Sequence, residues 1–411
     1  MGETQPSAGS APAAPALLSG MRVASFCHFL QGPAGTQYLA DMGADVVKVE
    51  PPRGAWERHW AAAGGARVGE ATPLFLCGNR NKRSLAIDLK HPRSKEVVFR
   101  LIERSHVMVE NFRPGALDRL GFGYDEVRRR KPDIIYASAS GYGGSGPFLE
   151  RPGQDLLAQA MSGLIASSAR PDGQPTAVGC AGIDQHGAAL LALGIVGAYV
   201  RWLQTGEGTR VESSLLSAGI DLQAESLTAH FAAGRPKGRA DRDPHLATWF
   251  HEAPYGVYRL ADCHVVFSMN KLDALGDALG RAEVAACGGL DPYLERDRIA
   301  RTLAAAVADL DYATVAARLE PRGLWFARVD DFDDLEHNPQ VRHNGTFREV
   351  TVGGRQATLV THPVRYDGAA PEIRGLPERP GQDSRAILGE LGYASSDIDG
   401  LVDDGVIVAG A

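Results

Sequence analysis

The sequence predicts an α/β protein with a large domain built on a doubly wound, mostly parallel sheet and a second, smaller α+β domain. In the first half of the 411 residues, short β-branched runs alternate with amphipathic helical runs, the pattern of βαβ units. After about residue 225 this alternation of strands and helices ends. A linker-like stretch follows, then a hairpin with alternating apolar and polar residues, and then Ala- and Leu-rich helical runs. A chain of this length with 44% hydrophobic residues can bury more than one core.

The alternation of the first half begins with RVASFC, a short apolar run typical of a strand. AGTQYLADMG follows Pro33 as a helix, and ADVVKVE completes a βαβ unit. PRSKEVVFRLIERS has the apolar spacing of a helix, HVMVEN that of a strand, and the helix GYDEVRRRK leads into the strand PDIIYASAS. The expected strands are therefore 22–27, 44–50, 106–111 and 132–140, and the expected helices are 34–43, 92–105 and 123–131.

Ligands of doubly wound sheets gather at the carboxyl ends of the strands. We therefore expect the site on the segments CHFLQGP, EPPRG, ENFRPG and SGYGG. The domain prediction is a flexible N-terminal tail at 1–20, a large α/β domain at 21–225 that carries this site, a smaller α+β domain with its linker at 226–335, and a C-terminal segment at 336–411 that returns to the large domain. The hairpin YGVYRLADCHVVFSM should turn near Asp262.

Charge and composition limit the classes of ligand and the cellular location that we expect for this protein. The net charge of −7 argues against nucleic acid, whereas the 14 Lys and Arg against 7 Asp and Glu between Arg80 and Lys131 suit an anionic ligand. The RRRK run at 128–131 is more typical of the solvated face of a helix. Five cysteines without CxxC spacing favour a reducing, cytoplasmic location, and we expect no metal site. We expect that no apolar run reaches the length needed to span a membrane.

The stretch GYGGSGP, residues 141–147, contains the G-x-G-x-x-G spacing of dinucleotide-binding loops. That motif requires a helix to open on the glycines, but Pro147 and the following FLERPG prevent one. We therefore expect no nicotinamide site here, and the next helix is expected only within DLLAQAMSGLIASS.

Five long motifs in order carry a family resemblance: LADMGADVVKVEPP, NRNKRSLAIDLK, VMVENFRPGALDRLGFGYDEV, SGYGGSGPFLERPGQDLLAQAMSG and ILGELGY. With them the chain resembles the family III, or CaiB/BaiF-like, CoA-transferases, which include formyl-CoA and carnitine CoA-transferases and are related to alpha-methylacyl-CoA racemase. The resemblance implies a transferase acting on acyl-CoA and small carboxylic acids, with coenzyme A as substrate and no tightly bound cofactor. It also implies a homodimer of two interlocked ring-shaped subunits.

Carried over residue by residue, the resemblance assigns CoA contacts to the strand ends of the large domain. Arg113, Arg119 and Lys90 would give charge-assisted bonds to its phosphates, and the glycines would let backbone N–H groups approach it. Two positions depart from the family branch, because Pro51 replaces an Arg, for which Arg53 could compensate, and Ser140 replaces a Lys. The implied CoA-binding residues are Leu30, Ile87, Asp88, Leu89, Lys90, Asn111, Phe112, Arg113, Arg119, Ser140, Gly141, Tyr142 and Gly143, with Gln31 beside them.

The resemblance places the catalytic nucleophile at Asp172, directly before Gly-Gln-Pro-Thr. A carboxylate can attack a thioester, giving a mixed anhydride and then an aspartyl-CoA thioester, without ATP. The alternative role for Asp172 is that of a turn residue, because Pro-Asp-Gly is a strong turn signal. His28 and Gln31 are possible substrate and oxyanion contacts, although the family glutamine aligns with Leu30 and His28 could equally serve in packing.

Two other functions stay open. A racemase would exchange the alpha proton of an acyl-CoA with a histidine in a Gly-His-Asp triplet, but this chain has Gln154 there and keeps only the second aspartate, Asp184, which also suits an N-cap. His186 should lie inside the following helix as a packing or hydrogen-bonding residue. A non-catalytic acyl-CoA-binding protein is the other alternative.

Two features concern the acyl group. GAWERHW, residues 54–60, carries two tryptophans and His59, which suit either core packing or a wall of the acyl pocket. The glycine-rich lid of the formyl-CoA branch has no counterpart in KGRADRDPHLATWF, which suggests a different acyl substrate or a different way of excluding water.

Overall fold

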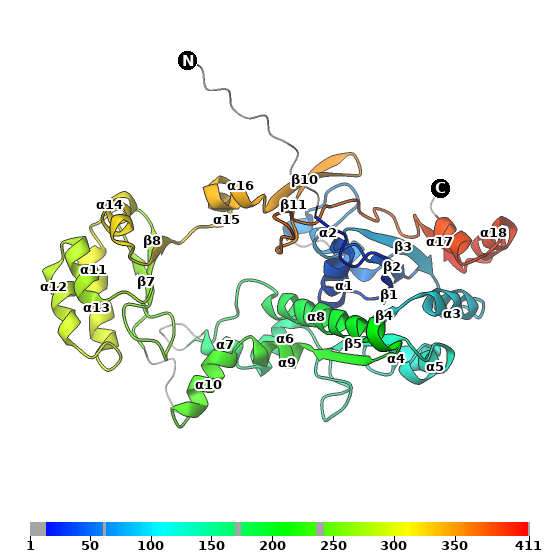
Figure 1. Cartoon of the computed structure of the whole chain (residues 1–411), viewed down its shortest axis with the longest axis horizontal. Coiled ribbons are helices and arrows are strands. Elements are labelled where there is room, and N and C mark those ends of the chain that lie inside the picture. The colour runs from blue at the N-terminus through cyan, green and yellow to red at the C-terminus, as the bar shows by residue number, and fades with distance from the viewer. Residues whose placement is uncertain (1–13, 61–62, 169–173, 236–241, 410–411) are drawn as a thin grey trace, which may run out of the picture. The chain divides into compact units, whose positions relative to one another are not determined.

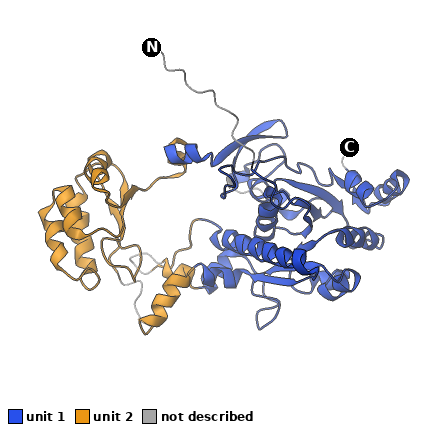
Figure 2. Ribbon diagram, viewed as in Figure 1, with its two compact units in different colours: residues 1–162, 180–222, 339–411 blue, residues 163–179, 223–338 orange. Residues whose placement is uncertain are grey.

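A computed structural model describes residues 14–60, 63–168, 174–235 and 242–409 (Figure 1). The chain forms two compact units, one of residues 1–162, 180–222 and 339–411, and one of residues 163–179 and 223–338 (Figure 2). Each unit has its own hydrophobic core.

A seven-stranded sheet forms the centre of the first unit. All neighbouring strands pair in parallel except the last strand of the chain, which pairs antiparallel at one edge, so the mostly parallel α/β fold is confirmed. The spatial order is β12 (Ile407–Val408), β3 (Lys82–Ile87), β2 (Asp45–Glu50), β1 (Arg22–Phe26), β4 (Val107–Glu110), β5 (Ile135–Ser140) and β6 (Arg210–Ser214).

Helices cover both faces of this sheet, as the near-continuous apolar strands require. Alternate strand residues point to opposite faces, so Ala24 packs in one core cluster and Val23 in another. The Val23 side holds α1 (Gln31–Asp41) and α8 (Gly182–Thr205), which lie against each other. The Ala24 side holds α3 (Ser94–Arg104), α4 (Ala116–Leu120), α5 (Tyr124–Arg130), α17 (Ser384–Glu390) and α18 (Ser395–Asp403).

Every element expected in the first 140 residues is present, but three strands of the sheet were not expected. The missed β3 begins with Lys82 and Arg83, and β6 is polar, so neither shows the apolar run used to identify strands. The edge strand β12 has only two residues. Short polar or edge strands are recognisable only by their pairing partners.

The described end of the expected N-terminal tail packs on the first unit. Leu18 is buried in the core cluster that contains Met21 and Leu39, and its N–H donates to the carbonyl of Met42 (2.8 Å). Residues 1–13 lie outside the described part of the chain.

Helix α8 is long and apolar enough, by length and composition alone, to cross a membrane. The expectation that no run reaches this length therefore fails by that criterion. Within the described structure, 33% of this apolar stretch is buried, and Leu191, Ile195 and Tyr199 pack in the core beside the sheet.

The remaining elements of the first unit frame the sheet. The hairpin of β10 (Phe347–Val352) and β11 (Arg355–Val360) packs against α2 (Pro73–Gly78) and the residues just before it, through a small apolar cluster that includes Ala71, Leu76 and Leu359. These elements are α2 (Pro73–Gly78), α6 (Asp155–Met161), α9 (Leu215–Asp221), α16 (Pro339–Asn344), β10 (Phe347–Val352) and β11 (Arg355–Val360), with the 3-10 turns η1 (Trp56–Arg58) and η2 (Ala63–Gly65).

The second unit is an α+β structure around Tyr258, Phe267 and Leu303. The expected hairpin is confirmed, because Arg259 pairs with His264 and the turn contains Asp262. Its elements are α7 (Leu164–Ser167), α10 (Ala224–Ala232), β7 (Gly256–Arg259), β8 (His264–Phe267), α11 (Leu272–Leu279), α12 (Ala282–Ala285), η3 (Ala286–Gly289), α13 (Arg296–Val307), α14 (Tyr312–Leu319), η4 (Glu320–Arg322), β9 (Phe326–Arg328) and α15 (Phe332–His337).

Candidate active site

The loops after β1 and β4, neighbours in the sheet, are joined by a pair of hydrogen bonds. The Asn111 side chain accepts from the backbone N–H of His28 (2.8 Å) and donates to its carbonyl (2.7 Å). The His28 ring lies 4.9 Å from that of Phe112. Three residues assigned to the site by sequence therefore meet at the carboxyl edge of the sheet.

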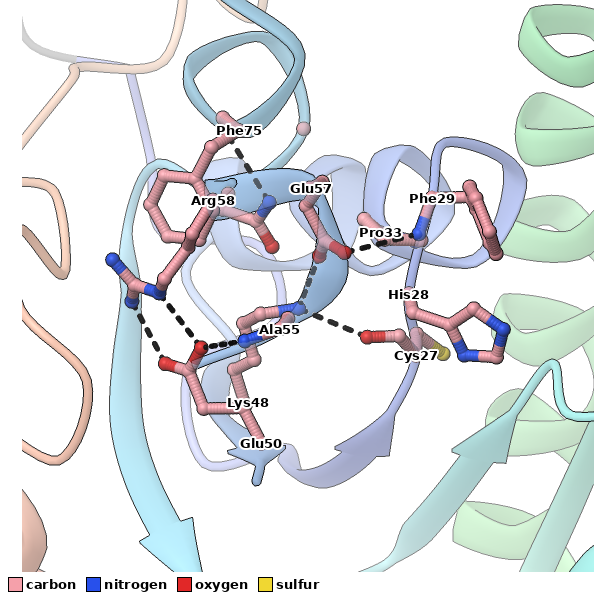
Figure 3. Close-up of polar contacts among 12 residues, drawn as sticks. Cys27, His28, Phe29, Pro33, Lys48, Glu50, Ala55, Glu57, Arg58 and Phe75 are labelled. Atoms are coloured by element: carbon pink, nitrogen blue, oxygen red, sulfur yellow. Dashed lines mark hydrogen bonds and ion pairs between the residues drawn. The ribbon is translucent and has the colours of Figure 1, made fainter. Parts of the chain in front are cut away.

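A buried ion pair ties the loop after β1 to the loop after β2 (Figure 3). Lys48 Nζ donates to the Cys27 carbonyl (2.9 Å) and to Glu57 Oε1 (2.7 Å), and Glu57 Oε2 accepts from the N–H of Phe29 (3.2 Å). Both charged side chains are at most 1% exposed, so the pair is stable only because each charge is paired and hydrogen-bonded. Phe29 is held at φ +61°, a conformation uncommon outside glycine.

A second ion pair anchors η1 through its last residue. Arg58 donates through Nε and Nη2 to the two oxygens of Glu50, each at 2.7 Å, and Glu50 also accepts from Ala55 N–H (2.8 Å) (Figure 3). The hydroxyl of Ser84 donates to Glu50 as well (2.6 Å). Burial alone would raise the pKa of Glu50, but the hydrogen bonds and charge of Arg58 outweigh it and hold that pKa below its usual value. The backbone of η1 is therefore fixed by both of its charged residues.

His28 is held neutral. Burial is the main cause that lowers its pKa to about 4, and Lys48 adds to this while Glu57 opposes it. Its ring stacks at a tilt against Phe29 (4.9 Å between centroids). A neutral imidazole here can contact a thioester or accept a hydrogen bond, but it does not supply a positive charge near pH 7.

Gln31 and Asp184 meet where α1 begins and α8 begins. The backbone N–H of Gln31 lowers the pKa of the Asp184 carboxyl, and Gln31 is 4% exposed with its side chain against Gly187 of α8. The amide Nε2 of Gln31 is buried with no hydrogen-bond partner among the described residues. An unpaired buried amide is unfavourable and unusual, so this donor is a candidate to meet a ligand oxygen.

Asp184 is not the N-cap considered from its place in the sequence. The helix starts at Gly182, and Asp155 from α6 supplies the capping oxygen: its Oδ1 accepts from the N–H groups of Ile183 and Asp184, each at 2.9 Å. The pKa of Asp184 is raised to about 7. Burial is the main cause, the negative charge of Asp155 adds to it, and the backbone N–H of Gln31 acts in the opposite direction. Asp184 can therefore hold or release a proton near neutral pH.

His186, in contrast, has the structural role expected of it. It lies inside α8, and its Nε2 is 2.8 Å from Asp221 Oδ2, a hydrogen bond that ties α8 to α9.

The residues that sequence assigns to CoA lie at the ends of β1, β3, β4 and β5 or in the loops that follow them, all in one sheet. Ile87 is a core residue of β3, and Asp88 accepts from the N–H of Lys90 (2.9 Å). Leu89 and Phe112 pack against the core, and Leu30 is buried beside Ala34 and Ala188. The cations expected to bind phosphate, Lys90, Arg113 and Arg119, are exposed and form no ion pair with any residue that the structure describes.

The glycine segment after β5 has no helix, as the sequence indicated. Ser140 Oγ accepts from the N–H of Gly143 (2.9 Å), and Tyr142 OH donates to the Pro152 carbonyl (3.2 Å). A Cβ on Gly141 would lie 2.6 Å from Gly153 Cα, so two parts of this loop touch through their glycine backbones. The glycines therefore serve a folded loop at the strand end, and α6 begins only at Asp155.

Asp172 lies outside the described residues. Among the described residues no group of three or more His, Cys, Asp and Glu side chains could hold a metal ion.

Several residues that shape this edge were missed by sequence reasoning. Lys48, Glu57 and Asp155 were not singled out as supports of the site, and Lys82 is a further buried cation, whose Nζ donates to Pro33 O (2.8 Å), Gly78 O (2.6 Å) and Asn79 Oδ1 (3.0 Å). The one available signal was a lysine in the middle of the apolar strand VVKVE, because a buried lysine needs a partner.

Comparisons with known proteins agree with this architecture. The chain is 33% identical to the acetyl-CoA:oxalate CoA-transferase of Acetobacter aceti over 69% of this chain and 71% of that protein. It is 31% identical to the succinyl-CoA:glutarate CoA-transferase of Mus musculus over 95% of this chain and 90% of that protein.

A third relative also has a solved structure. The probable fatty acyl-CoA transferase of Mycobacterium tuberculosis is 29% identical over 92% of this chain and 98% of that protein. The crystal structure of an Asp-to-Ala variant of that protein matches with a TM-score of 0.79 and 26% identity, covering 92% of this chain and 99% of that one.

The model of CoA-transferase family III matches residues 18–384, which is most of the chain. The sheet, its carboxyl-edge loops and these relatives together show that the chain belongs to CoA-transferase family III, a family of enzymes that act between acyl-CoA and carboxylates.

Proposed function

We propose that this protein transfers CoA from an acyl-CoA donor to a carboxylic acid acceptor through an aspartyl intermediate on Asp172. The sequence supports the nucleophile by the placement of Asp172 directly before Gly-Gln-Pro-Thr. The structure supports the enzyme by an orphaned amide donor at the carboxyl edge of the sheet, Gln31 Nε2, and this is the observation that carries the proposal.

The proposed reaction passes the thioester along without ATP. An Asp172 carboxylate oxygen attacks the thioester carbonyl carbon, and the C–S bond breaks. CoA leaves as a thiolate, and the acyl group stays on Asp172 as a mixed anhydride. The thiolate then attacks the aspartyl carbonyl, which releases the donor acid and forms an aspartyl-CoA thioester. The acceptor carboxylate attacks that thioester, and the thiolate returns to the acceptor's carbonyl, so that a new acyl-CoA leaves and the Asp172 carboxylate is restored.

Each step places negative charge on a carbonyl oxygen. Rotation of the Gln31 side chain away from Gly187 would let its amide donate to that oxygen, as oxyanion stabilisation requires. Its buried N–H, unpaired without substrate, would gain its partner in the transition state. His28, held neutral, would contact the thioester without competing for the charge.

CoA itself would bind along the loops after β1, β3, β4 and β5. Lys90, Arg113 and Arg119 are exposed and unpaired by any described carboxylate, so each remains available to a phosphate. The loop of Ser140–Gly143, in which the Gly143 N–H already donates to Ser140 Oγ, would place its other backbone N–H groups beside the ligand. We further propose the interlocked homodimer of the family as the working assembly.

Racemase chemistry has less support. The position of its histidine base is Gln154, which cannot take a proton from carbon, although Asp184 titrates near neutral pH. Proton exchange into an acyl-CoA in deuterated water without any acceptor acid would identify that reaction.

The test of the proposed function is a transfer assay with the purified protein. Acyl-CoA thioesters are mixed with small carboxylic acids, and new thioesters are identified by mass spectrometry. Gln31→Leu should lower kcat by about 10²-fold to 10³-fold while free CoA still binds, which is the range for losing one oxyanion donor. Transfer at the ordinary rate by Gln31→Leu would remove the amide from the reaction.

A further inference from the structure

Three large aromatic side chains form an exposed row at the carboxyl edge of the sheet. Phe29 and Trp56 lie 4.6 Å apart between ring centroids, and Trp56 and Trp60 are stacked at 5.4 Å. We call Phe29, Trp56 and Trp60 the aromatic row. Their exposed fractions are 44%, 46% and 48%, so none of them serves as ordinary core packing.

The segment that carries the two tryptophans buries its charged side chains and exposes its aromatic ones. Glu57 and Arg58, between the two tryptophans, are 0% and 6% exposed, whereas the tryptophans face outward. Folded chains ordinarily bury aromatic side chains and expose charged ones. A reversal at four of the five residues 56–60, with His59 exposed in the ordinary way, points to a surface kept apolar for a ligand.

This exposure does not come from a loose loop. Glu57 is bound to Lys48 and to the N–H of Phe29, and Arg58 is bound to Glu50 (Figure 3). Arg58 also donates to the carbonyls of Pro377 (2.9 Å) and Glu378 (3.0 Å) and lies 3.8 Å above the Phe75 ring. The backbone under the row is thus fixed, and its rings are held in place before a ligand arrives.

The row is continuous with the proposed CoA cleft. His28 touches Phe29 on one side and Phe112 on the other, each at 4.9 Å, and Phe112 belongs to the segment assigned to CoA. A thioester at His28 would therefore extend its acyl group over Phe29 toward the tryptophans.

We propose that the aromatic row binds the acyl group of the CoA thioester and selects flat aromatic or bulky apolar acyl groups. The proposal rests on the proposed transferase function and names its donor class. Flat rings 4.5–7 Å apart attract by offset or edge contacts, and an apolar acyl group covers the exposed rings.

A free carboxylate at the end of the acyl chain would gain little from this surface. His28, which touches the row, is neutral near pH 7. Arg67, bound to the same segment, already donates to the carbonyls of Arg58 (3.3 Å), His59 (3.3 Å) and Glu70 (2.9 Å). A dicarboxylic acyl group should consequently be the poorer ligand.

The experiment measures binding and transfer of benzoyl-CoA, acetyl-CoA and succinyl-CoA by the full chain, with calorimetry for binding and mass spectrometry for transfer. Benzoyl-CoA should bind about tenfold more tightly than the other two. Trp56→Ala and Trp60→Ala should each remove most of that preference and leave acetyl-CoA binding within about twofold. The control is Trp325→Ala, a comparably exposed tryptophan (56%) in the second unit, which should change neither.

Three outcomes would overturn the aromatic row as the acyl site. Benzoyl-CoA can show no preference, the tryptophan variants can weaken all three thioesters and free CoA equally, or they can change the sedimentation of the protein, which would assign the row to contact with a second copy. A benzoyl preference that depends on the row but comes without transfer would support the row and contradict the transferase proposal. Transfer without a preference for benzoyl-CoA would support the transferase proposal and contradict the aromatic row as the acyl site.

Discussion

Asp155 and Asp184 are linked across the start of α8: a single oxygen of Asp155 accepts hydrogen bonds from the N–H groups of both Ile183 and Asp184, each at 2.9 Å. The other oxygen of Asp155 accepts from Gln159 Nε2 (2.6 Å). Asp155 therefore places a carboxylate at the positive end of the helix, where negative charge is favourable. Its neighbour Asp184 then has to ionise close to an existing negative charge.

The first prediction follows from the pKa of Asp184, which is raised from 3.8 to about 7 in the folded protein. Because the folded state binds the proton more tightly, the stability that this proton provides is present below about pH 4 and is lost as the pH rises through 7. Asp184→Asn should therefore gain stability relative to the wild type between about pH 4.5 and pH 8, by on the order of 2 kcal/mol after allowing for partial exposure.

Urea unfolding of both proteins at those two pH values measures this difference. The amide introduced by Asp184→Asn does not ionise, so the variant should show the flatter pH profile. A difference in unfolding free energy that stays constant across the range would show that Asp184 does not titrate there.

The second prediction concerns the buried pair Lys48–Glu57, with 2.7 Å between Nζ and Oε1. Glu57→Gln would leave a buried lysine without its counter-charge and should lower the free energy of unfolding by about 3–5 kcal/mol. The matched control is Glu207→Gln, which breaks the exposed ion pair with Arg201 and should cost less than about 1 kcal/mol. Equal effects of the two substitutions in denaturant unfolding would refute the role given to Glu57.

The third prediction concerns CoA binding. Arg119→Ala should weaken CoA by about 1.5–3 kcal/mol, the value of a hydrogen bond to a charged group, with little effect on later steps. The control is Arg129→Ala, because Arg129 lies on the solvated face of α5 and pairs with Glu126. Calorimetric titration with CoA checks both, and an unchanged affinity in Arg119→Ala would remove this residue from the site.

The fourth prediction concerns assembly. Interlocked rings cannot separate without unfolding, so the proposed homodimer should persist on dilution into the nanomolar range. Sedimentation velocity with a fluorescent label measures this directly. A reversible monomer–dimer equilibrium would contradict interlocking and leave the fold of each unit unaffected.

Local patterns predicted the elements whose apolar residues repeat along the chain. They identified β1, β2, β4 and β5 and the helices α1, α3 and α5, but not the short helices α2 and α4, and hence predicted the edge where the site residues gather. They missed β3 because its first residue, Lys82, is a charge whose inward position depends on three acceptors from other segments. Such acceptors become visible only when the chain is folded.

The same limit applies to two alternatives that the sequence left open at the site. The cap of α8 comes from Asp155, 28 residues before Ile183 in the chain, whereas local capping rules pointed to Asp184. From the sequence, Trp56 and Trp60 suited either core packing or the wall of a pocket. They are exposed because Glu57 and Arg58 take the buried positions between them. Partners distant in sequence decided each of these cases.

Chemical trapping during turnover shows whether Asp172 forms the covalent intermediate. An aspartyl anhydride or thioester is an activated acyl group, so hydroxylamine added during turnover should convert Asp172 to a hydroxamate, and borohydride should reduce it to homoserine. Peptide mapping by mass spectrometry locates the change, with Asp172→Asn as the control that still binds CoA and has lost transfer. We expect a single modified peptide, the one that contains Asp172. Modification of Asp155 or Asp184 instead, or ordinary turnover by Asp172→Asn, would contradict it.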